Sequence, residues 1–178
     1  AAPSLYSGIS TDTGSFLYPS AQASTFHTAA RLLEAGADKN LIQAHFWENT
    51  SKKKVRILEH LFGNITYLLD DSAAYSVFSL ETQQALDVST LDLEGIVAMI
   101  KEIEGVEVAV LFTEMPDGSC KISLRSRDWF DCNRCANVFG GGGHVRASGA
   151  TLTRPLAEAV EAVLAEITQE WEEAHHAE

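Results

Sequence analysis

A run of four glycines at positions 140–143, directly before His144, constrains this chain more than any other feature. Glycine has no Cβ atom, so its backbone can turn tightly and approach a ligand closely. A concave row of backbone N–H groups can bind an anion. Cationic side chains lie nearby, since Arg146 follows the run and Arg125 and Arg127 precede it. We therefore predict a phosphate-binding site here, in preference to a plain turn between a helix and a strand.

The charge of the chain is unevenly distributed. Its formal net charge is −12 at pH 7, which argues against a protein that coats long duplex nucleic acid. Between Cys120 and Gly149, however, there are five basic and two acidic residues, whereas seven glutamates and no lysine or arginine follow Pro155. A small basic region in an acidic chain suits a small anionic ligand better than a long polyanion.

The composition is ordinary for a globular protein, with 46% hydrophobic and 21% charged residues. The apolar runs are too short to cross a bilayer and the chain does not open with a signal-peptide pattern, so we expect a cytoplasmic protein without a membrane partner.

Cys132 and Cys135 share one helical stripe with Ala136 and Phe139, and no second Cys or His pair lies at zinc spacing. We therefore predict that both thiols pack in the core rather than bind zinc.

The period of the apolar residues changes along the chain, and the change predicts an α/β fold. Helical spacing in the first part predicts helices that begin at Ser24 or Thr25, after Asp38 and at Ser51. Strands and helices then alternate. The predicted strands cover 65–69, 74–80, 106–113, 120–126 and 150–153, and the predicted helices cover 92–103, 131–139 and 153–171. The expected architecture is a C-terminal mixed sheet flanked by helices, preceded by a mostly helical part.

The spacing also predicts which residues face inward. In the first three helices these are Phe26, Ala29, Ala30 and Leu33, then Leu41, Ile42, His45 and Phe46, then Val55, Leu58, Leu61 and Phe62. Residues 1–11 read as a short apolar segment. Asp92 is the expected N-cap of the helix predicted over 92–103. Beyond Trp171 we expect an acidic tail in which His175 and His176 are solvated.

Three stretches, in order, resemble a known superfamily. Residues 8–16 (GISTDTGSF) resemble the last metal-binding motif of the Asp-His-His (DHH) phosphoesterases. Residues 123–126 (SLRS) and 141–149 (GGGHVRASG) resemble the two signatures of the DHH-associated C-terminal domain, and residues 105–109 fit the strand before them. Nearly the whole chain is similar to the nano-RNases of this superfamily, also called oligoribonuclease/pAp phosphatases.

The resemblance implies a manganese-dependent hydrolase, as the full-length protein, that cleaves short oligonucleotides from one end and also 3′-phosphoadenosine 5′-phosphate (pAp). Residues 1–50 would be a C-terminal remnant of the catalytic DHH domain, residues 51–63 a linker helix, and residues 64–178 the substrate-binding domain. The implied partner is a short single-stranded oligonucleotide or a nucleotide phosphate, and a homodimer stays open. The chain would be a C-terminal piece of a longer protein, either cut or degenerate.

The resemblance also assigns residues. Asp12 matches an aspartate that ligates metal in the family. The positions matched to substrate binding are Arg125, Arg127, Gly141, Gly142, Gly143, His144 and Ser148. Arg146 is added from its charge alone.

The Asp-His-His triplet itself is absent from this sequence. A hard divalent metal needs several carboxylate or imidazole ligands, so Asp12 alone cannot hold a two-metal centre. We therefore expect a phosphoesterase as the full-length protein, and no catalytic residue, activity or bound metal in this chain alone. Two alternatives stay open, a cyclic-dinucleotide phosphodiesterase and a nucleotide- or nucleic-acid-binding module without catalysis.

Overall fold

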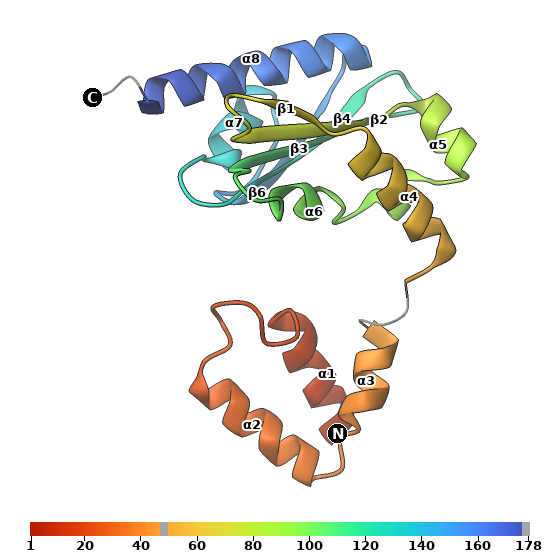
Figure 1. Ribbon diagram of the computed structural model, residues 1–178, viewed down its shortest axis with the longest axis vertical. Coiled ribbons are helices and arrows are strands. Elements are labelled where there is room, and N and C mark those ends of the chain that lie inside the picture. Colours follow the sequence, from red (N-terminus) through yellow and green to blue (C-terminus); the bar gives the residue numbers. More distant parts are fainter. Residues whose placement is uncertain (47–49, 176–178) are drawn as a thin grey trace. The chain divides into compact units, whose positions relative to one another are not determined.

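The computed structural model describes residues 1–46 and 50–175, and the chain forms two compact units, Ala1–Ser51 and Lys52–Glu178. The first unit is helical and the second contains a sheet with helices on both faces (Figure 1). The helix that we predicted as a separate linker, α4 (Lys52–Gly63), belongs to the second unit. Ile57 and Leu61 on this helix are buried in the core of that unit. The domain bounds that the resemblance implies stay a prediction.

The first unit consists of three helices, α1 (Ala2–Asp12), α2 (Ala23–Glu34) and α3 (Lys39–Phe46). The opening apolar segment is thus a helix. Asp38 caps α3 as predicted, because its Oδ1 accepts the backbone N–H of Leu41 at 3.0 Å. The N-cap of α2 is instead Gln22, whose N–H donates to Thr25 Oγ1 at 3.3 Å. The buried core of the unit is small and consists of Tyr6, Ala29, Ala37 and Ile42.

Several predicted inward faces are wrong. The exposed residues that helical spacing had placed inside are Phe26, Ala30, Leu33, Leu41, His45, Phe46, Val55 and Phe62. Spacing identifies the apolar stripe of a helix, but it does not determine whether another element covers that stripe.

The second unit contains a six-stranded mixed sheet with the order β1-β2-β3-β4-β6-β5. Its strands are β1 (Thr66–Leu68), β2 (Ala73–Phe78), β3 (Val108–Glu114), β4 (Cys120–Ser126), β5 (Gly142–His144) and β6 (Ala147–Leu152). Strands β2 and β3 pair in parallel, and the other neighbours are antiparallel. The mixed sheet flanked by helices confirms the predicted fold class.

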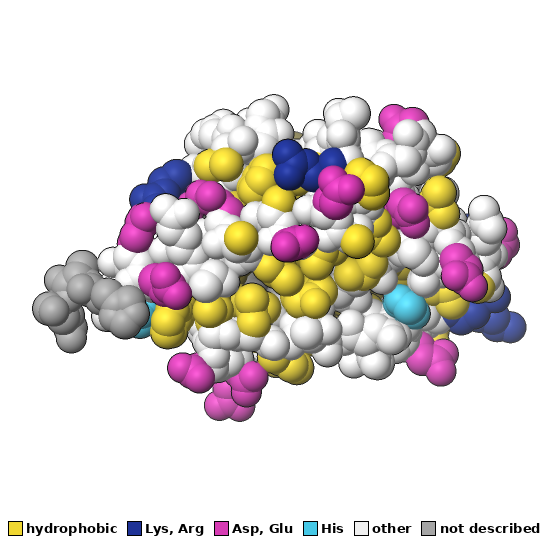
Figure 2. Space-filling view, turned by 90° about the horizontal axis from the view of Figure 1, so that it is seen from above, with side chains coloured by type: hydrophobic (Ala, Val, Ile, Leu, Met, Phe, Trp, Pro, Cys, Tyr) yellow, Lys and Arg dark blue, Asp and Glu magenta, His cyan; other side chains and the backbone are white. Residues whose placement is uncertain are grey.

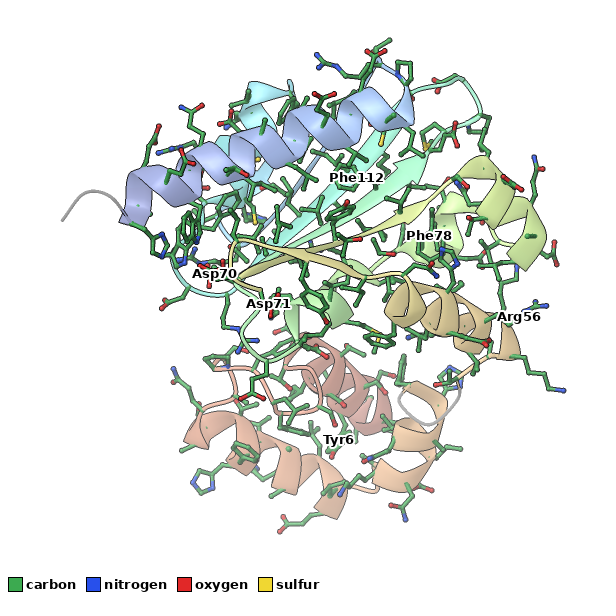
Figure 3. All side chains as sticks on the ribbon, turned by 45° about the horizontal axis from the view of Figure 1, so that its top comes forward. Tyr6, Arg56, Asp70, Asp71, Phe78 and Phe112 are labelled. Carbon is green, nitrogen blue, oxygen red and sulfur yellow. The ribbon has the colours of Figure 1, made fainter. Side chains whose placement is uncertain are left out.

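Each face of the sheet carries its own core. Helices α7 (Cys132–Val138) and α8 (Leu156–His175) pack on the face that contains Phe112. Helix α4, the 3-10 helix η1 (Thr90–Leu93) and α6 (Val97–Lys101) pack on the face that contains Phe78. Both phenylalanines are labelled in Figure 3. Figure 2 views the molecule from the side of α8, where acidic side chains are scattered around exposed apolar ones.

Three elements differ from the predictions. Helix α5 (Leu80–Leu86) was not predicted. The helix predicted over 92–103 is divided into η1 and α6, because Gly95 lies between them with a φ of +76°. Asp92 therefore caps nothing downstream and instead accepts the N–H of Ser89 at 2.8 Å. The end of the glycine run is also not an open loop, since residues 142–144 form β5.

The three cysteines are free and fully buried, which confirms core packing for Cys132 and Cys135. Burial raises the pKa of each thiol, that of Cys120 to about 11.

Helix α8 continues past Trp171 to His175, which is exposed and stacks on Trp171 with ring centroids 4.5 Å apart. His176 lies outside the described residues. No helix in the described part of the chain is both long and apolar enough to cross a bilayer.

Candidate substrate-binding groove

Strand β4 separates the core from the candidate site by simple alternation. Cys120, Ile122, Leu124 and Ser126 are buried on the side of α7 and α8. The residues between them, Lys121, Ser123 and Arg125, are half-buried on the opposite side. Successive residues of a strand point to opposite faces, so these three polar side chains share one face.

The register of the sheet brings Arg125 and His144 to one level. Arg125 pairs with Ala147 on β6, and Ala147 pairs with His144 on β5. Neighbouring strands are about 4.8 Å apart, so the two Cα atoms lie about 10 Å apart with only a methyl side chain at the position between them. An anionic group of a ligand could therefore fit between the guanidinium and the imidazole.

Two further levels cross the same strands. At the next level Ser123 pairs with Leu111 on one side and Gly149 on the other. At the level beyond it, Lys121 pairs with Thr113 and Thr151. Polar groups thus occupy the two outer levels, and small or apolar residues occupy the middle one.

Two hollows lie along these levels. The α6 hollow has a volume of about 320 Å³ and is lined by Thr90, Leu93, Glu94, Gly95, Val97, Leu111, Thr113, Lys121, Ser123 and Arg125. The glycine hollow has a volume of about 570 Å³ and is lined by Lys121, Ile122, Ser123, Gly140, Gly141, Ser148, Gly149, Ala150 and Thr151. Lys121 and Ser123 line both, so the two hollows meet at these residues. Volumes in this range are typical of small-molecule sites.

The glycine run does not form the predicted row of free N–H groups. The N–H of Gly140 donates to the carbonyl of Asn137 at 3.0 Å, and that of Gly141 to the carbonyl of Ala136 at 2.9 Å. The N–H of Gly143 donates to Asn133 Oδ1 at 2.9 Å. These three groups are already satisfied by α7, so the anion-nest prediction is corrected for them.

The glycines are needed instead for close packing of backbone. A Cβ atom on Gly141 would lie 2.2 Å from the carbonyl oxygen of Gly149 and 2.5 Å from the Cβ of Ala150. Gly143 has a φ of +149°, and a Cβ there would lie 2.6 Å from the carbonyl oxygen of Ala147. Gly142 differs, because its nearest neighbour would be Asn137 Oδ1 at 3.6 Å.

Two of the predicted cationic groups hold the fold together. The guanidinium of Arg127 donates to the carbonyls of Lys101 and Ile103, at 2.8 and 3.2 Å, near the end of α6. The guanidinium of Arg146 donates to the carbonyl of Phe130 at 2.8 Å. Ser148 likewise has a structural contact, since its hydroxyl donates to the carbonyl of His144 at 2.7 Å across the β5–β6 turn.

Arg125 and His144 remain available to a ligand. Arg125 donates from Nη1 to the carbonyl of Leu124 at 2.8 Å, which leaves most of its donors for other partners. His144 is exposed. Of the residues matched to substrate binding, Arg125 lines the α6 hollow and Gly141 and Ser148 line the glycine hollow. His144 lines neither hollow and is placed beside them by its register with Arg125.

Sequence reasoning missed three residues that shape this region: Glu107, Lys121 and Asn133. For Lys121 the signal was the alternation of Lys121, Ser123 and Arg125 along one strand. Glu107 and Asn133 act through hydrogen bonds to distant backbone, which no local pattern reveals.

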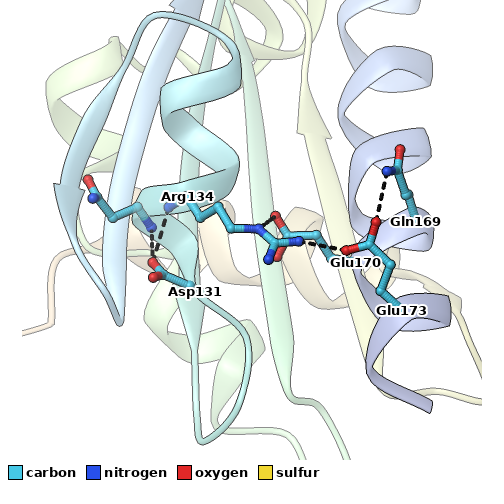
Figure 4. Close-up of polar contacts among 6 residues, drawn as sticks. Asp131, Arg134, Gln169, Glu170 and Glu173 are labelled. Carbon is cyan, nitrogen blue, oxygen red and sulfur yellow. Dashed lines mark hydrogen bonds and ion pairs between the residues drawn. The ribbon is translucent and has the colours of Figure 1, made fainter. Parts of the chain in front are cut away.

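An ion-pair cluster links α7 to α8 (Figure 4). Arg134 Nη2 lies 2.9 Å from Glu173 Oε2, and Arg134 Nε lies 3.3 Å from Glu170 Oε1. Glu170 is 6% exposed, and burial raises its pKa despite the neighbouring guanidinium. The cluster joins the two helices, and none of its residues lines either hollow.

The predicted metal ligand Asp12 lies in the first unit. It is exposed and lines a small hollow with Ile9, Thr13, Ser20, Ser24, Thr25 and Thr28, none of which is a carboxylate or an imidazole. Within residues 1–46 and 50–175, no three His, Cys, Asp or Glu side chains gather as a metal ion would require. The described donor set therefore does not fit a divalent metal centre by itself.

Comparison with known proteins places this groove in a family. The DHHA1 domain family matches residues 70–173. The chain is 32% identical over 150 residues to a probable bifunctional oligoribonuclease and PAP phosphatase NrnA of Streptococcus mutans, covering 84% of this chain and 47% of that protein. It is 28% identical to the corresponding Thermus thermophilus protein, covering 95% of this chain and 50% of the relative. The chain thus spans about half the length of these relatives.

A solved structure agrees with these similarities. The crystal structure of an exopolyphosphatase-related protein from Bacteroides fragilis superimposes with a TM-score of 0.86 at 31% identity. The match covers 94% of this chain and 49% of that one. Because the DHHA1 family matches more than half of the sequence, including the whole groove from β3 to β6, the chain belongs to the DHHA1 domain family.

Proposed function

We propose that the groove binds the charged end of a short oligonucleotide or of pAp, and that the whole protein is a phosphoesterase that hydrolyses these substrates. The observation that carries the proposal is the common level of Arg125 and His144, with Ala147 between them. Relatives of about twice this length are named as oligoribonuclease and PAP phosphatase, which supports the same substrate class.

The chemistry of the two side chains fits a phosphate. Arginine stays charged at all physiological pH values, and its planar fork matches two oxygens of a phosphate group. Imidazole can donate a third hydrogen bond from the opposite side. The chain would hold the phosphate in a fixed position, and positioning is a large part of the catalysis of phosphoryl transfer.

We propose that manganese takes part only in the whole protein. Such an ion would activate water and stabilise the leaving oxygen. Asp12 could supply one carboxylate, but the described residues do not complete a site, and we derive no catalytic step through the metal. This chain alone should therefore bind substrate without hydrolysing it.

We also propose a cytoplasmic location, because its cysteines are free thiols.

Isothermal titration calorimetry of the chain with pAp tests the binding role. Arg125→Gln and His144→Gln should each weaken binding, and loss of the arginine contact should cost about 1.5–3 kcal/mol, or roughly tenfold or more in Kd. Arg154→Gln is the matched control, because Arg154 is exposed and lines neither hollow. Unchanged affinity in both groove variants would disprove the proposal.

A hydrolysis assay with manganese tests the enzymatic part. The chain alone should release no phosphate from pAp while still binding it. Hydrolysis by the chain alone would contradict the binding-only role, and a full-length protein that bound but never cleaved pAp would contradict the phosphoesterase.

A further inference from the structure

We propose that Lys121 binds a second anionic group of the ligand, so that the groove selects substrates with two phosphates over those with one. This inference rests on the proposed function, since it extends the same groove. It assigns a specificity-determining role to a residue outside the motifs that identify the family in this sequence.

The position of Lys121 carries the inference. It lies on the same face of β4 as Arg125, four residues away, which corresponds to about 13 Å along a strand. The two backbone positions are far enough apart for each side chain to contact a separate phosphate group. Lys121 also lines both hollows, whereas Arg125 lines only the α6 hollow and Gly141 only the glycine hollow.

The surroundings of Lys121 are suited to an anion. The residues paired with it on both sides are Thr113 and Thr151, so a threonine lies on each side of Lys121 at the same level of the sheet. Thr113 lines the α6 hollow and Thr151 the glycine hollow. A lysine ammonium binds a phosphate oxygen as a point charge, and neighbouring threonine hydroxyls can add hydrogen bonds to the same group.

Lys121 is half-buried yet has no structural role of the kind that occupies Arg127 and Arg146. Within residues 1–46 and 50–175, no carboxylate lies within ion-pair distance of its Nζ. Glu94 lines the same hollow but is not paired with it. Partial burial of an unpaired cation is unfavourable, so a bound anion would relieve that cost.

The middle level completes the site. Ser123 and Gly149 present little side chain there, and the neighbouring residue on β3 is the apolar Leu111. The sugar or base of a nucleotide could lie over this floor, with one phosphate near Arg125 and His144 and the other near Lys121. A 5′-phosphorylated dinucleotide has two such anionic groups, and AMP, with its single phosphate, does not.

The test is calorimetric titration of the chain with 5′-phosphorylated diadenylate (pApA) and with AMP. Lys121→Gln should weaken binding of pApA about tenfold and change the affinity for AMP less than twofold. It should also reduce the salt dependence of pApA binding by about 0.7 in the slope of log K against log salt concentration, the loss of one phosphate contact. Lys121→Arg should keep most of the affinity.

Two controls separate the outcomes. Lys52→Gln removes an equal charge from an exposed position that lines neither hollow, and it should leave both affinities unchanged. Arg125→Gln should weaken both ligands. Suppose that the wild type binds both ligands and that Arg125→Gln weakens both. If Lys121→Gln then changes the affinity for both ligands equally, or for neither, the second-phosphate role is wrong and the proposed function stands. If the wild type binds neither ligand, both proposals are overturned.

Discussion

Oε1 of Glu107 accepts the backbone N–H of Phe130 at 3.0 Å, although 23 positions separate the two residues. The same carboxylate accepts the N–H groups of Asp128 and Trp129 at 2.8 to 2.9 Å. A row of backbone N–H groups does form an anion nest in this protein, but it lies at 128–130 and is filled by the chain's own carboxylate.

This contact begins a series of interactions that position the groove. The carbonyl of Phe130 accepts hydrogen bonds from Arg146 and from the hydroxyl of Ser126. Asp131 then caps α7, and Asn133 on that helix holds the N–H of Gly143. The β5–β6 hairpin that carries His144 is therefore fixed from the end of β4.

Glu107→Gln should destabilise the second unit by about 1.5–3 kcal/mol, because an amide has one acceptor oxygen and no charge with which to bind three N–H groups. Urea unfolding measures the change. The exposed Glu104→Gln is the matched control and should change stability by less than about 0.5 kcal/mol. Equal stability of both variants would show that the nest contact is not stabilising.

Gly141→Ala should destabilise the protein by about 1–3 kcal/mol, because the new methyl group would overlap the backbone of β6. Gly142→Ala should cost less than about 0.5 kcal/mol, since a Cβ at Gly142 has ordinary contact distances. Thermal unfolding of the two variants compares neighbouring positions of one motif. A greater loss for Gly142→Ala would contradict the packing role assigned to Gly141.

Arg127→Gln should lower stability by about 1 kcal/mol and leave pAp affinity within twofold of the wild type, because its guanidinium binds backbone carbonyls of the fold. Arg125→Gln should show the reverse, with weaker binding and little change in stability. Calorimetry and urea unfolding of both variants check this. A large loss of pAp affinity in Arg127→Gln would show that Arg127 contributes to ligand binding.

The thiols of Cys120, Cys132 and Cys135 should not react with a disulfide reagent at pH 8 while the protein is folded. All three are fully buried and burial raises the pKa of each, so thiolate is scarce and inaccessible. A spectrophotometric thiol assay should find no rapid reaction in buffer and three thiols in denaturant. Fast reaction of any thiol in the native state would exclude the buried arrangement.

Glu170 should make the folded state less stable as the pH rises. Burial raises the pKa of this carboxyl in the folded state above its unfolded value of about 4.3, so its contribution to stability is complete below that pH and is lost as the pH rises through the folded pKa. Glu170→Gln should therefore gain stability relative to the wild type between pH 4 and pH 7. Thermal unfolding at several pH values tests this, with the exposed Glu172→Gln as control. If the wild type became more stable relative to Glu170→Gln as the pH rises, the raised pKa of Glu170 would be contradicted.

The sequence predicted much of the fold and part of the candidate site. The alternating strand that contains Arg125, the helix with Cys132 and Cys135, and the β1–β2 hairpin follow from spacing within ten residues or fewer. These elements form where they were predicted, because their periodicity reflects burial by the same core. The ligand of Arg125 and His144 stays a prediction.

The structure alone decided which polar groups are free. Arg125 and Arg127 are indistinguishable as neighbours in a sequence, but only Arg127 reaches the carbonyls at the end of α6. The pairing of β4 with β6 then aligned Arg125 with Ala147 and Lys121 with Thr151. The sequence by itself determined the elements and their apolar faces, since those depend on local periodicity. Tertiary structure determined the hydrogen-bond partners and the register, since those depend on residues that are distant in the chain.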